Sequence, residues 1–411
     1  MAKREAGEGP AEAAGAIGLV SLNRRYFSLD VLRGAAVLGI LPVNIVLFAT
    51  IMAASGNPTA YGDFSGTEVW LWRAVHVLAE QKFLTLFSIL FGASLVLMTE
   101  RVERKGGNAW EHYRRRMLWL LVFGMVHAYL FWFGDILVGY ALCGLVAFWF
   151  RKTKISQLWL LGGLLLAVPS LFNVAFQLSI GFLPEEMLST FQNEWEPGPE
   201  AIASELAAYQ GGWLSQLKFR VVQAFGMQVG GFMVYTFWRV LGLMLFGIAL
   251  QRTGILIGRN HSRRLYLDMF LFGVGLGLPL VAFGAEQNLQ LGFFYKQSMF
   301  NGMQWNYWGS IGMAIGYIGL LILISRIRYF VMVTGALATV GRMALTNYLL
   351  QTLICSILFY YLGYFGQWGR EKMMLAVLAI WAFQVLGSVF WLRHFEQGPM
   401  ERIWRKLTYR G

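Results

Sequence analysis

Long runs of apolar residues, separated by short polar segments, dominate this chain. A helix that crosses a bilayer needs about 20 mostly apolar residues, so the pattern predicts membrane-spanning helices. The approximate ranges of the segments are 31–53, 83–99, 117–134, 136–150, 158–180, 232–251, 265–285, 308–325, 343–363 and 373–392. We therefore expect an all-α fold, a polytopic integral membrane helix bundle of about ten transmembrane helices.

The remaining segments divide the chain around this bundle. We expect a disordered tail at 1–27, the transmembrane helical domain at 28–395, and a basic tail at 396–411. Within the domain, 181–217 combines apolar positions with a Glu-Pro-Gly-Pro break at 196–199. That loop is predicted to form short helices that cap one face of the bundle.

Charge alternates from one connection to the next. Connection 100–116 and the tail 396–411 are rich in Arg and Lys, whereas 181–217 contains Glu and no basic residue. The positive-inside rule then places both termini in the cytoplasm and 181–217 on the outer face. In a soluble protein, the net charge of +12 would suggest binding to nucleic acid. In this chain we interpret the charge as a signal of how the helices are oriented in the membrane. We expect a lipid bilayer as partner and no nucleic acid.

Composition excludes several other classes of protein. Hydrophobic residues make up 57% of the chain and charged residues 14%, against about 25% charged in soluble domains. Cys143 and Cys355 both lie in apolar stretches, which excludes a disulfide framework. The five histidines are scattered without the spacing of a metal site, so we expect no metal.

One group of ionisable residues precedes the second span. Arg73, His76 and Glu80 are spaced by three and four residues and share a helix face, and Lys82 follows them. Segment 67–81 is predicted to be an amphipathic helix near the outer surface. Two interpretations stay open: an interfacial anchor with a solvated polar face, or the polar, substrate-binding wall of an outward cavity.

A second pair lies on the third span. His127 can exchange protons near neutral pH, and Asp135 can orient such a histidine. Eight residues on one helix separate them by about 12 Å along the axis, so we expect them to line one cavity without bonding directly. Alternatively, His127 packs as a satisfied buried residue and Asp135 caps the following helix.

Other polar residues of the spans also have two interpretations. Asn44 follows Pro42 and either offers a polar site or bonds to a neighbouring helix. Arg239 either snorkels to the interface or contacts an anion, and Asn347 enters span nine among polar neighbours. Glycines at 309, 312, 316 and 319 form a stripe over 309–319 that allows close helix approach, either within the chain or in a homo-oligomer.

Four blocks of residues carry a resemblance to a known family. They are Leu29-Asp30-Val31-Leu32-Arg33-Gly34 with Asn44; Lys82-Phe83 through Phe91-Gly92; His127 with Gly134-Asp135-Ile136-Leu137 and Tyr140-Ala141; and Gly341 to Gln351 with Gly398-Pro399, Trp404-Arg405 and Leu407-Thr408-Tyr409. Together they resemble the YeiB-like bacterial membrane proteins, classed as a domain of unknown function. The resemblance spans essentially the whole chain and implies a multi-pass protein of the bacterial cytoplasmic membrane. It departs at Arg402-Ile403, where the family has Trp-Leu.

That family is similar, more distantly, to transmembrane acyltransferases, including the lysosomal enzyme that acetylates heparan glucosamine. The similarity rests on the Leu-Asp-x-x-Arg-Gly opening and Asn44, and it transfers no complete catalytic set. It implies an acyl-CoA donor at the basic cytoplasmic face and a glycan or envelope hydroxyl as acceptor outside.

Under this hypothesis, a histidine removes the acceptor proton, a carboxylate orients it, and a polar donor stabilises the oxyanion. The candidates for these roles are His127 or His76, Asp135 or Glu80, and Asn44 or Arg239. Three further residues are expected to support the site from the cytoplasmic side: Asp30, Arg33 and Arg342. A transporter or flippase of a small metabolite or lipid-linked precursor is the alternative, and a non-catalytic partner that docks through 181–217 is a third.

Overall fold

The computed structural model describes residues 27–258 and 261–409, and these residues form helices joined by turns and loops. Within these ranges, eight helical segments are long and apolar enough to cross a membrane. This agrees with the predicted polytopic helical bundle. The predicted tail 1–27 lies outside the described residues except for Phe27, which begins α2.

The helices of the first half are α2 (Phe27–Ala49), α3 (Ala53–Gly56), α4 (Thr67–Leu78), α5 (Lys82–Arg104), α6 (Ala109–Val126), η1 (His127–Phe131), α7 (Leu137–Ala147), η2 (Phe148–Phe150), α8 (Ile155–Ser179), α9 (Glu185–Trp195), α10 (Pro199–Gln210) and α11 (Trp213–Gly226). Those of the second half are η3 (Met227–Thr236), α12 (Phe237–Arg252), η4 (Ile255–Ile257), α13 (Arg263–Gln290), α14 (Tyr295–Gln297), η5 (Ser298–Gly302), α15 (Met303–Ser325), η6 (Arg328–Phe330), α16 (Val331–Arg342), α17 (Ala344–Ser356), η7 (Ile357–Tyr361), α18 (Arg370–His394) and α19 (Pro399–Tyr409).

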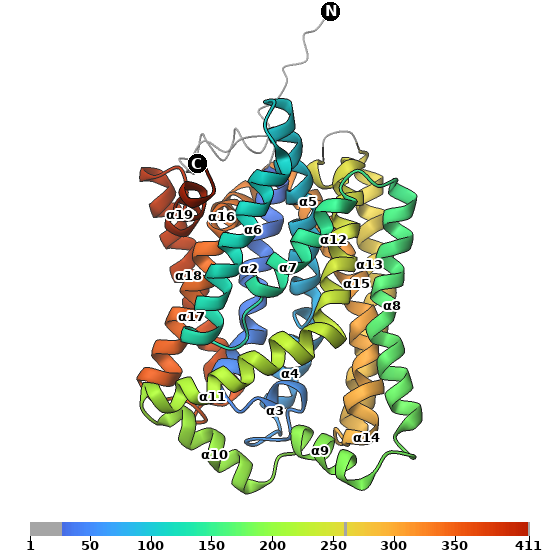
Figure 1. Cartoon of the computed structure of the whole chain (residues 1–411), viewed down its shortest axis with the longest axis vertical. Helices are drawn as coiled ribbons and strands as arrows, with labels where there is room; N and C mark the ends of the chain where they lie inside the picture. Colours follow the sequence, from blue (N-terminus) through green and yellow to red (C-terminus); the bar gives the residue numbers. More distant parts are fainter. Residues whose placement is uncertain (1–26, 259–260, 410–411) are drawn as a thin grey trace, which may run out of the picture.

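Helix α2 runs through the middle of the bundle, and the other long helices surround it (Figure 1). Helices α8, α13 and α15 stand on one side of it, and α17 and α18 on the other. The amphipathic α19 lies at one end of the molecule, and α3, α9 and α10 lie at the opposite end. We refer to these as the α19 end and the α9 end. Segment 181–217 thus folds into short helices at the α9 end.

Two of the expected spans differ from the eight long apolar helices. Segment 117–134 corresponds to α6, which begins earlier among basic residues, and to the π-helical turn η1. Segment 136–150 corresponds to the shorter apolar helix Leu137–Phe150. The chain between Arg326 and span nine, expected as a connection, contains a further helix, α16.

Helix α16 packs closely on α2 because glycines lie at the crossing. A Cβ at Gly34 would lie 1.9 Å from the Leu337 carbonyl oxygen, and one at Gly341 would lie 1.9 Å from that of Asp30. No side chain fits at such distances, so the two backbones touch. The glycine of the Leu-Asp-x-x-Arg-Gly opening therefore has a packing role.

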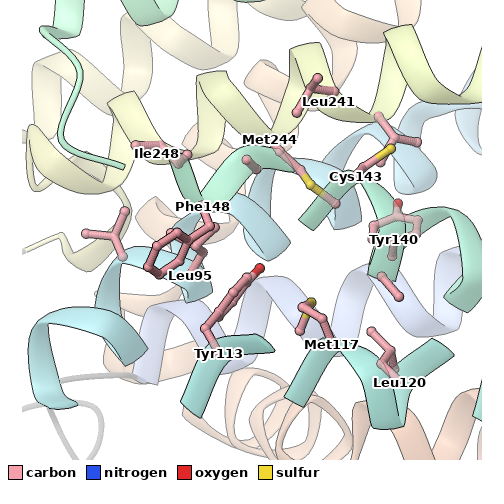
Figure 2. Close-up of a cluster of buried hydrophobic side chains, with 14 of the residues drawn as sticks. Leu95, Tyr113, Met117, Leu120, Tyr140, Cys143, Phe148, Leu241, Met244 and Ile248 are labelled. Atoms are coloured by element: carbon pink, nitrogen blue, oxygen red, sulfur yellow. The ribbon is translucent and has the colours of Figure 1, made fainter. Parts of the chain in front are cut away.

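A large apolar cluster joins α5, α6, α7 and α12 (Figure 2). Its buried members include Met117, Tyr140, Cys143 and Met244. Cys143 and Cys355 are both free and buried, as expected of core residues.

The glycine stripe of α15 faces α13 of the same chain. A Cβ at Gly277 of α13 would lie 2.6 Å from the Gly309 carbonyl oxygen, and one at Gly273 would lie 2.5 Å from the Gly316 amide nitrogen. The stripe on 309–319, which we considered for a homo-oligomer, is therefore occupied within one chain.

Helix α19 is tied to the bundle through Glu401, which caps α17. Its carboxylate accepts hydrogen bonds from the backbone amides of Leu345 and Thr346, at 2.7 and 3.1 Å, and from the Thr346 hydroxyl. Burial raises the pKa of Glu401, while these hydrogen bonds favour its charged form. They satisfy amides at the start of α17 that have no partner within the helix.

We expect Glu401→Ala to lower the free energy of unfolding by about 1–2 kcal/mol, the cost of a lost helix cap. Thermal unfolding of the purified protein in detergent would measure this loss. Glu396→Ala is the matched control, because that side chain is exposed and its residue contributes only a backbone carbonyl, to Arg342. Equal melting temperatures of the two variants would contradict the capping role.

Candidate functional site

His127 and Asp135 form a direct hydrogen bond, and our expectation that they could not do so was wrong. Helix α6 widens into the π-helical turn η1 at His127 and ends at Trp132, after which the chain turns back. The turn brings Asp135 Oδ1 to 2.7 Å from His127 Nδ1. The 12 Å separation assumed a straight helix through 134, and the helix ends before that.

Thr352 of α17 completes this cluster. Its hydroxyl lies 2.9 Å from His127 Nε2. The side chain of His127 is 2% exposed and that of Asp135 is 1% exposed. A charged carboxylate only accepts, so a neutral His127 ring donates from Nδ1 to Asp135 and accepts from the Thr352 hydroxyl at Nε2. Asp135 Oδ2 also accepts from the Val138 amide at 2.8 Å, so it caps α7 as well. We call Thr352, His127 and Asp135 the His127 relay.

Two neighbours hold the relay in place. The Tyr348 ring lies 5.2 Å from the His127 ring, and its hydroxyl accepts a hydrogen bond from the Ile136 amide. Trp132 stacks on Phe48 of α2 at 4.0 Å. The relay is thus formed where α2, α17 and the turn after η1 meet.

Asn44 lies on the side of α2 that faces this region. It is half-buried and lies one turn before Phe48 on the same helix face, and Phe48 stacks on Trp132. Within the described part of the chain no side-chain hydrogen bond of Asn44 is formed, so its amide remains available. The interhelical bond considered for it is not seen there.

The second polar cluster lies between α4 and α5. Glu80 Oε2 accepts from His76 Nδ1 at 2.8 Å, and His76 is 8% exposed. Elsewhere on α4, Trp70 is 67% exposed and Leu78 is 54% exposed. The polar face is therefore turned into the bundle and the apolar face outward, which is the arrangement of a cavity wall.

A small pocket, with room for about one water molecule, opens at this cluster. It is lined by Gly56, Trp72, His76, Glu80, Gln81, Trp195, Asn288, Phe293, Met303 and Asn306. Among the residues with described positions, none bonds to His76 Nε2. We call this the His76 pocket. The residues that line it include neither His127 nor Asn44, so the chain brings its candidate residues together as two separate clusters.

Lys82 and Arg239 are not among the residues that line the His76 pocket, and both form several buried hydrogen bonds. The Lys82 ammonium donates to the His76 carbonyl and to Asn306 Oδ1, both at 2.5 Å. Arg239 is 2% exposed and donates to the Tyr307 carbonyl and to the hydroxyls of Thr85 and Ser310. Arg239 therefore neither snorkels nor faces the pocket; it joins α12 to α5 and α15.

The other predicted residues lie outside both clusters. Arg73 forms an ion pair with Glu286 at 2.8 Å. Asn347 donates to the Ser388 hydroxyl and the Val340 carbonyl, which fixes α17 against α18. These contacts hold helices together.

The three residues expected to support the site from the cytoplasmic side each form an ion pair or a hydrogen bond. Arg33 forms an ion pair with Asp30 at 2.9 Å and donates to Ser94, while Arg342 donates to the Glu396 carbonyl. No group of three or more metal-ligating side chains occurs in residues 27–258 and 261–409.

Sequence reasoning missed Thr352 and Asn306. Each is separated by more than two hundred residues from the group it contacts. Thr352 lies in the expected span 343–363, and its one signal was a hydroxyl in an apolar stretch, which costs free energy unless a partner is present. Asn306 lies just before the expected span 308–325 and gave no such signal.

Comparison with known proteins identifies relatives along nearly the whole chain. Residues 250–411 match the family described as DUF418, protein of unknown function. The chain is 36% identical to "Uncharacterized protein YeiB" of Escherichia coli (strain K12), over 94% of this chain and 97% of that protein. It is 30% identical to "Uncharacterized protein YxaH" of Bacillus subtilis (strain 168), over 94% and 95%. No solved structure matches the chain.

Proposed function

We propose that this chain, which belongs to the DUF418 family of multi-pass membrane proteins together with YeiB, is a membrane-bound acyltransferase. The relatives confirm the resemblance inferred from the four sequence blocks. The observation that carries the proposed activity is the His127 relay, in which a carboxylate, an imidazole and a hydroxyl are aligned in the order used for acyl transfer.

Each member of the relay has a distinct part in the proposed reaction. His127 Nε2 removes the proton of the attacking hydroxyl, and Asp135 holds the ring orientation and stabilises the imidazolium that forms. The amide of Asn44 is the oxyanion donor in this proposal, because it faces the region of the relay with no side-chain bond to a described residue, whereas Arg239 is engaged.

The proposed orientation places the α19 end in the cytoplasm of a bacterium and the α9 end outside. Connection 100–116 and helix α19 carry many Arg and Lys residues, in accord with the positive-inside rule. The same basic surface suits the phosphates of an acyl-CoA donor. The acceptor is a glycan or another envelope hydroxyl that enters from the α9 end.

The activity is tested with purified protein and radiolabelled acetyl-CoA, supplied together with a panel of envelope glycans. Transfer of label to a glycan, dependent on the protein, is the expected result. Absence of transfer to every acceptor, together with absence of acetyl-CoA binding, would contradict the proposal.

The His76 pocket favours a second candidate, the transport of a small metabolite. Ionisable residues line a pocket at the break between α4 and α5, where Gln81 has a positive φ of 65°. Substrate sites of secondary transporters are often built at such discontinuous helices. Lys82 and Asn306 would set the charge and polarity of that site.

A single pair of variants separates the two candidates. If the chain is a transporter, Glu80→Gln abolishes flux in proteoliposomes, because it removes the charge beside His76 and Lys82, and His127→Gln leaves flux intact. If the chain is an acyltransferase, His127→Gln stops acyl transfer at equal protein amounts. Flux equal to that of empty vesicles across a broad panel of metabolites would exclude the transporter.

A further inference from the structure

The hydroxyl of Thr352 behaves differently from most other helical hydroxyls in this chain. A hydroxyl in a helix usually bonds to the carbonyl four residues earlier. Seven side chains of the described residues do so: Thr50, Ser88, Ser94, Thr99, Thr190, Thr334 and Thr408. Thr352 is 2% exposed and bonds instead to His127 Nε2, across to another helix.

The direction of that bond defines what His127 can deprotonate. Asp135 occupies Nδ1, and the Thr352 hydroxyl occupies Nε2. Both ring nitrogens are thus engaged, and Thr352 Oγ1 is the hydroxyl already placed to lose its proton to the base. This is the arrangement of an activated nucleophile, with a base within hydrogen-bond reach and a third group that orients the base.

The backbone near both Thr352 and His127 departs from a regular α-helix. His127 opens the π-helical turn η1, and helix α17 passes into the π-helical turn η7 at Ile357, five residues after Thr352. Such π-helical turns occur frequently at functional sites. The pair is also shielded from water, which protects a reactive ester from hydrolysis.

We propose that Thr352 is a catalytic nucleophile that carries the acyl group as an ester. This inference rests on the proposed acyl transfer and adds a covalent intermediate to it. The acyl group is transferred in two displacements, with His127 as base and then as acid in each.

In the first displacement, Thr352 Oγ1 attacks the thioester carbonyl of acyl-CoA. An Oγ1–C bond forms, the C–S bond breaks, and the hydroxyl proton passes through His127 Nε2 to the leaving thiolate, which gives free CoA. In the second, an acceptor hydroxyl gives its proton to His127 Nε2 and attacks the ester. Its oxygen–carbon bond forms, the Oγ1–C bond breaks, and His127 returns the proton to Thr352.

The test uses the intact purified protein and acetyl-CoA without an acceptor. We expect wild-type protein to gain one acetyl group on the peptide containing Thr352, and to exchange labelled CoA into acetyl-CoA. Thr352→Val keeps the shape without the hydroxyl and should lose both reactions, whereas Thr352→Ser should retain them. Thr99→Val is the matched control, because Thr99 is equally buried but bonds to its own helix.

With an acceptor present, Thr352→Val should lower the transfer rate by about 100-fold or more, and the double variant with His127→Gln should lose no more than His127→Gln alone. Acyl transfer at an undiminished rate by Thr352→Val would overturn the covalent role and leave the acyltransferase standing. The exchange reaction of the wild type decides the question even if Thr352→Val fails to fold: full acyl transfer without CoA exchange overturns the inference.

Discussion

His127→Gln is expected to lower the rate of acyl transfer by about 10²–10⁴-fold, the usual contribution of a general base. Glutamine preserves a polar side chain of similar length but cannot accept and release a proton. The change removes the base from a site in which Nδ1 is held by Asp135 at 2.7 Å and Nε2 faces Thr352 at 2.9 Å. Initial rates with labelled acetyl-CoA, at saturating donor, measure the effect.

His394→Gln is the matched control for this experiment. His394 is exposed on α18, and its ring bonds only to the Phe390 carbonyl one turn earlier, so its loss should leave the rate unchanged. Asp135→Asn should also slow the reaction, because an amide no longer stabilises the imidazolium. A wild-type rate for His127→Gln would remove the relay from the mechanism, and an equal loss in His394→Gln would indicate damage to folding.

Hydropathy predicted most of the bundle because lipid imposes a simple rule on spanning helices. Every backbone group in the bilayer must be bonded internally, so apolar length alone marks a spanning helix. The rule could not locate the end of η1, because Trp132-Phe133 continues the apolar run after the helix has stopped at Phe131. The missed turn is what brings Asp135 back to His127.

The same limit applies to the His76 pocket. The spacing of Arg73, His76 and Glu80 predicted one shared helix face, but α4 ends at Leu78 and Glu80 lies in the turn after it. The spacing also could not show whether that face lies in water or inside the protein. In a membrane protein the apolar side chains of a helix can point outward, and Trp70 and Leu78 are exposed here. Asn306, which bonds to both Lys82 and Glu80, comes from a helix more than two hundred residues away, and such a contact has no local signal.

Glycine spacing gave a third kind of information. The stripe on 309–319 predicted close approach of another helix, but the partner could have been in the same chain or in another copy. The structure supplies α13, whose Gly273 and Gly277 meet the stripe, and backbone contacts join the two helices. This pairing holds α15 in place. Helix α15 in turn places Asn306 at the His76 pocket and Tyr307 and Ser310 beside Arg239.

Gly277→Ala is therefore expected to destabilise the protein strongly. The new Cβ would lie 2.6 Å from the Gly309 carbonyl oxygen and 2.7 Å from the Met313 amide nitrogen, and both are backbone atoms that cannot rotate away. The helices must separate, and overpacking of this kind costs about 1–3 kcal/mol. The melting temperature of the purified protein in detergent, monitored by tryptophan fluorescence, should fall accordingly.

Gly275→Ala, two residues earlier on the same helix, is the control that isolates the helix contact. A Cβ at Gly275 meets no atom within 4 Å, so the substitution removes the flexibility of glycine without introducing a clash. We expect that variant to melt at or slightly above the wild-type temperature, since alanine is the better helix former. If both variants melt at the same temperature, close packing of α13 on α15 does not hold the bundle together. If only Gly277→Ala melts at a lower temperature, a single added methyl group has separated two helices whose contact stabilises the bundle.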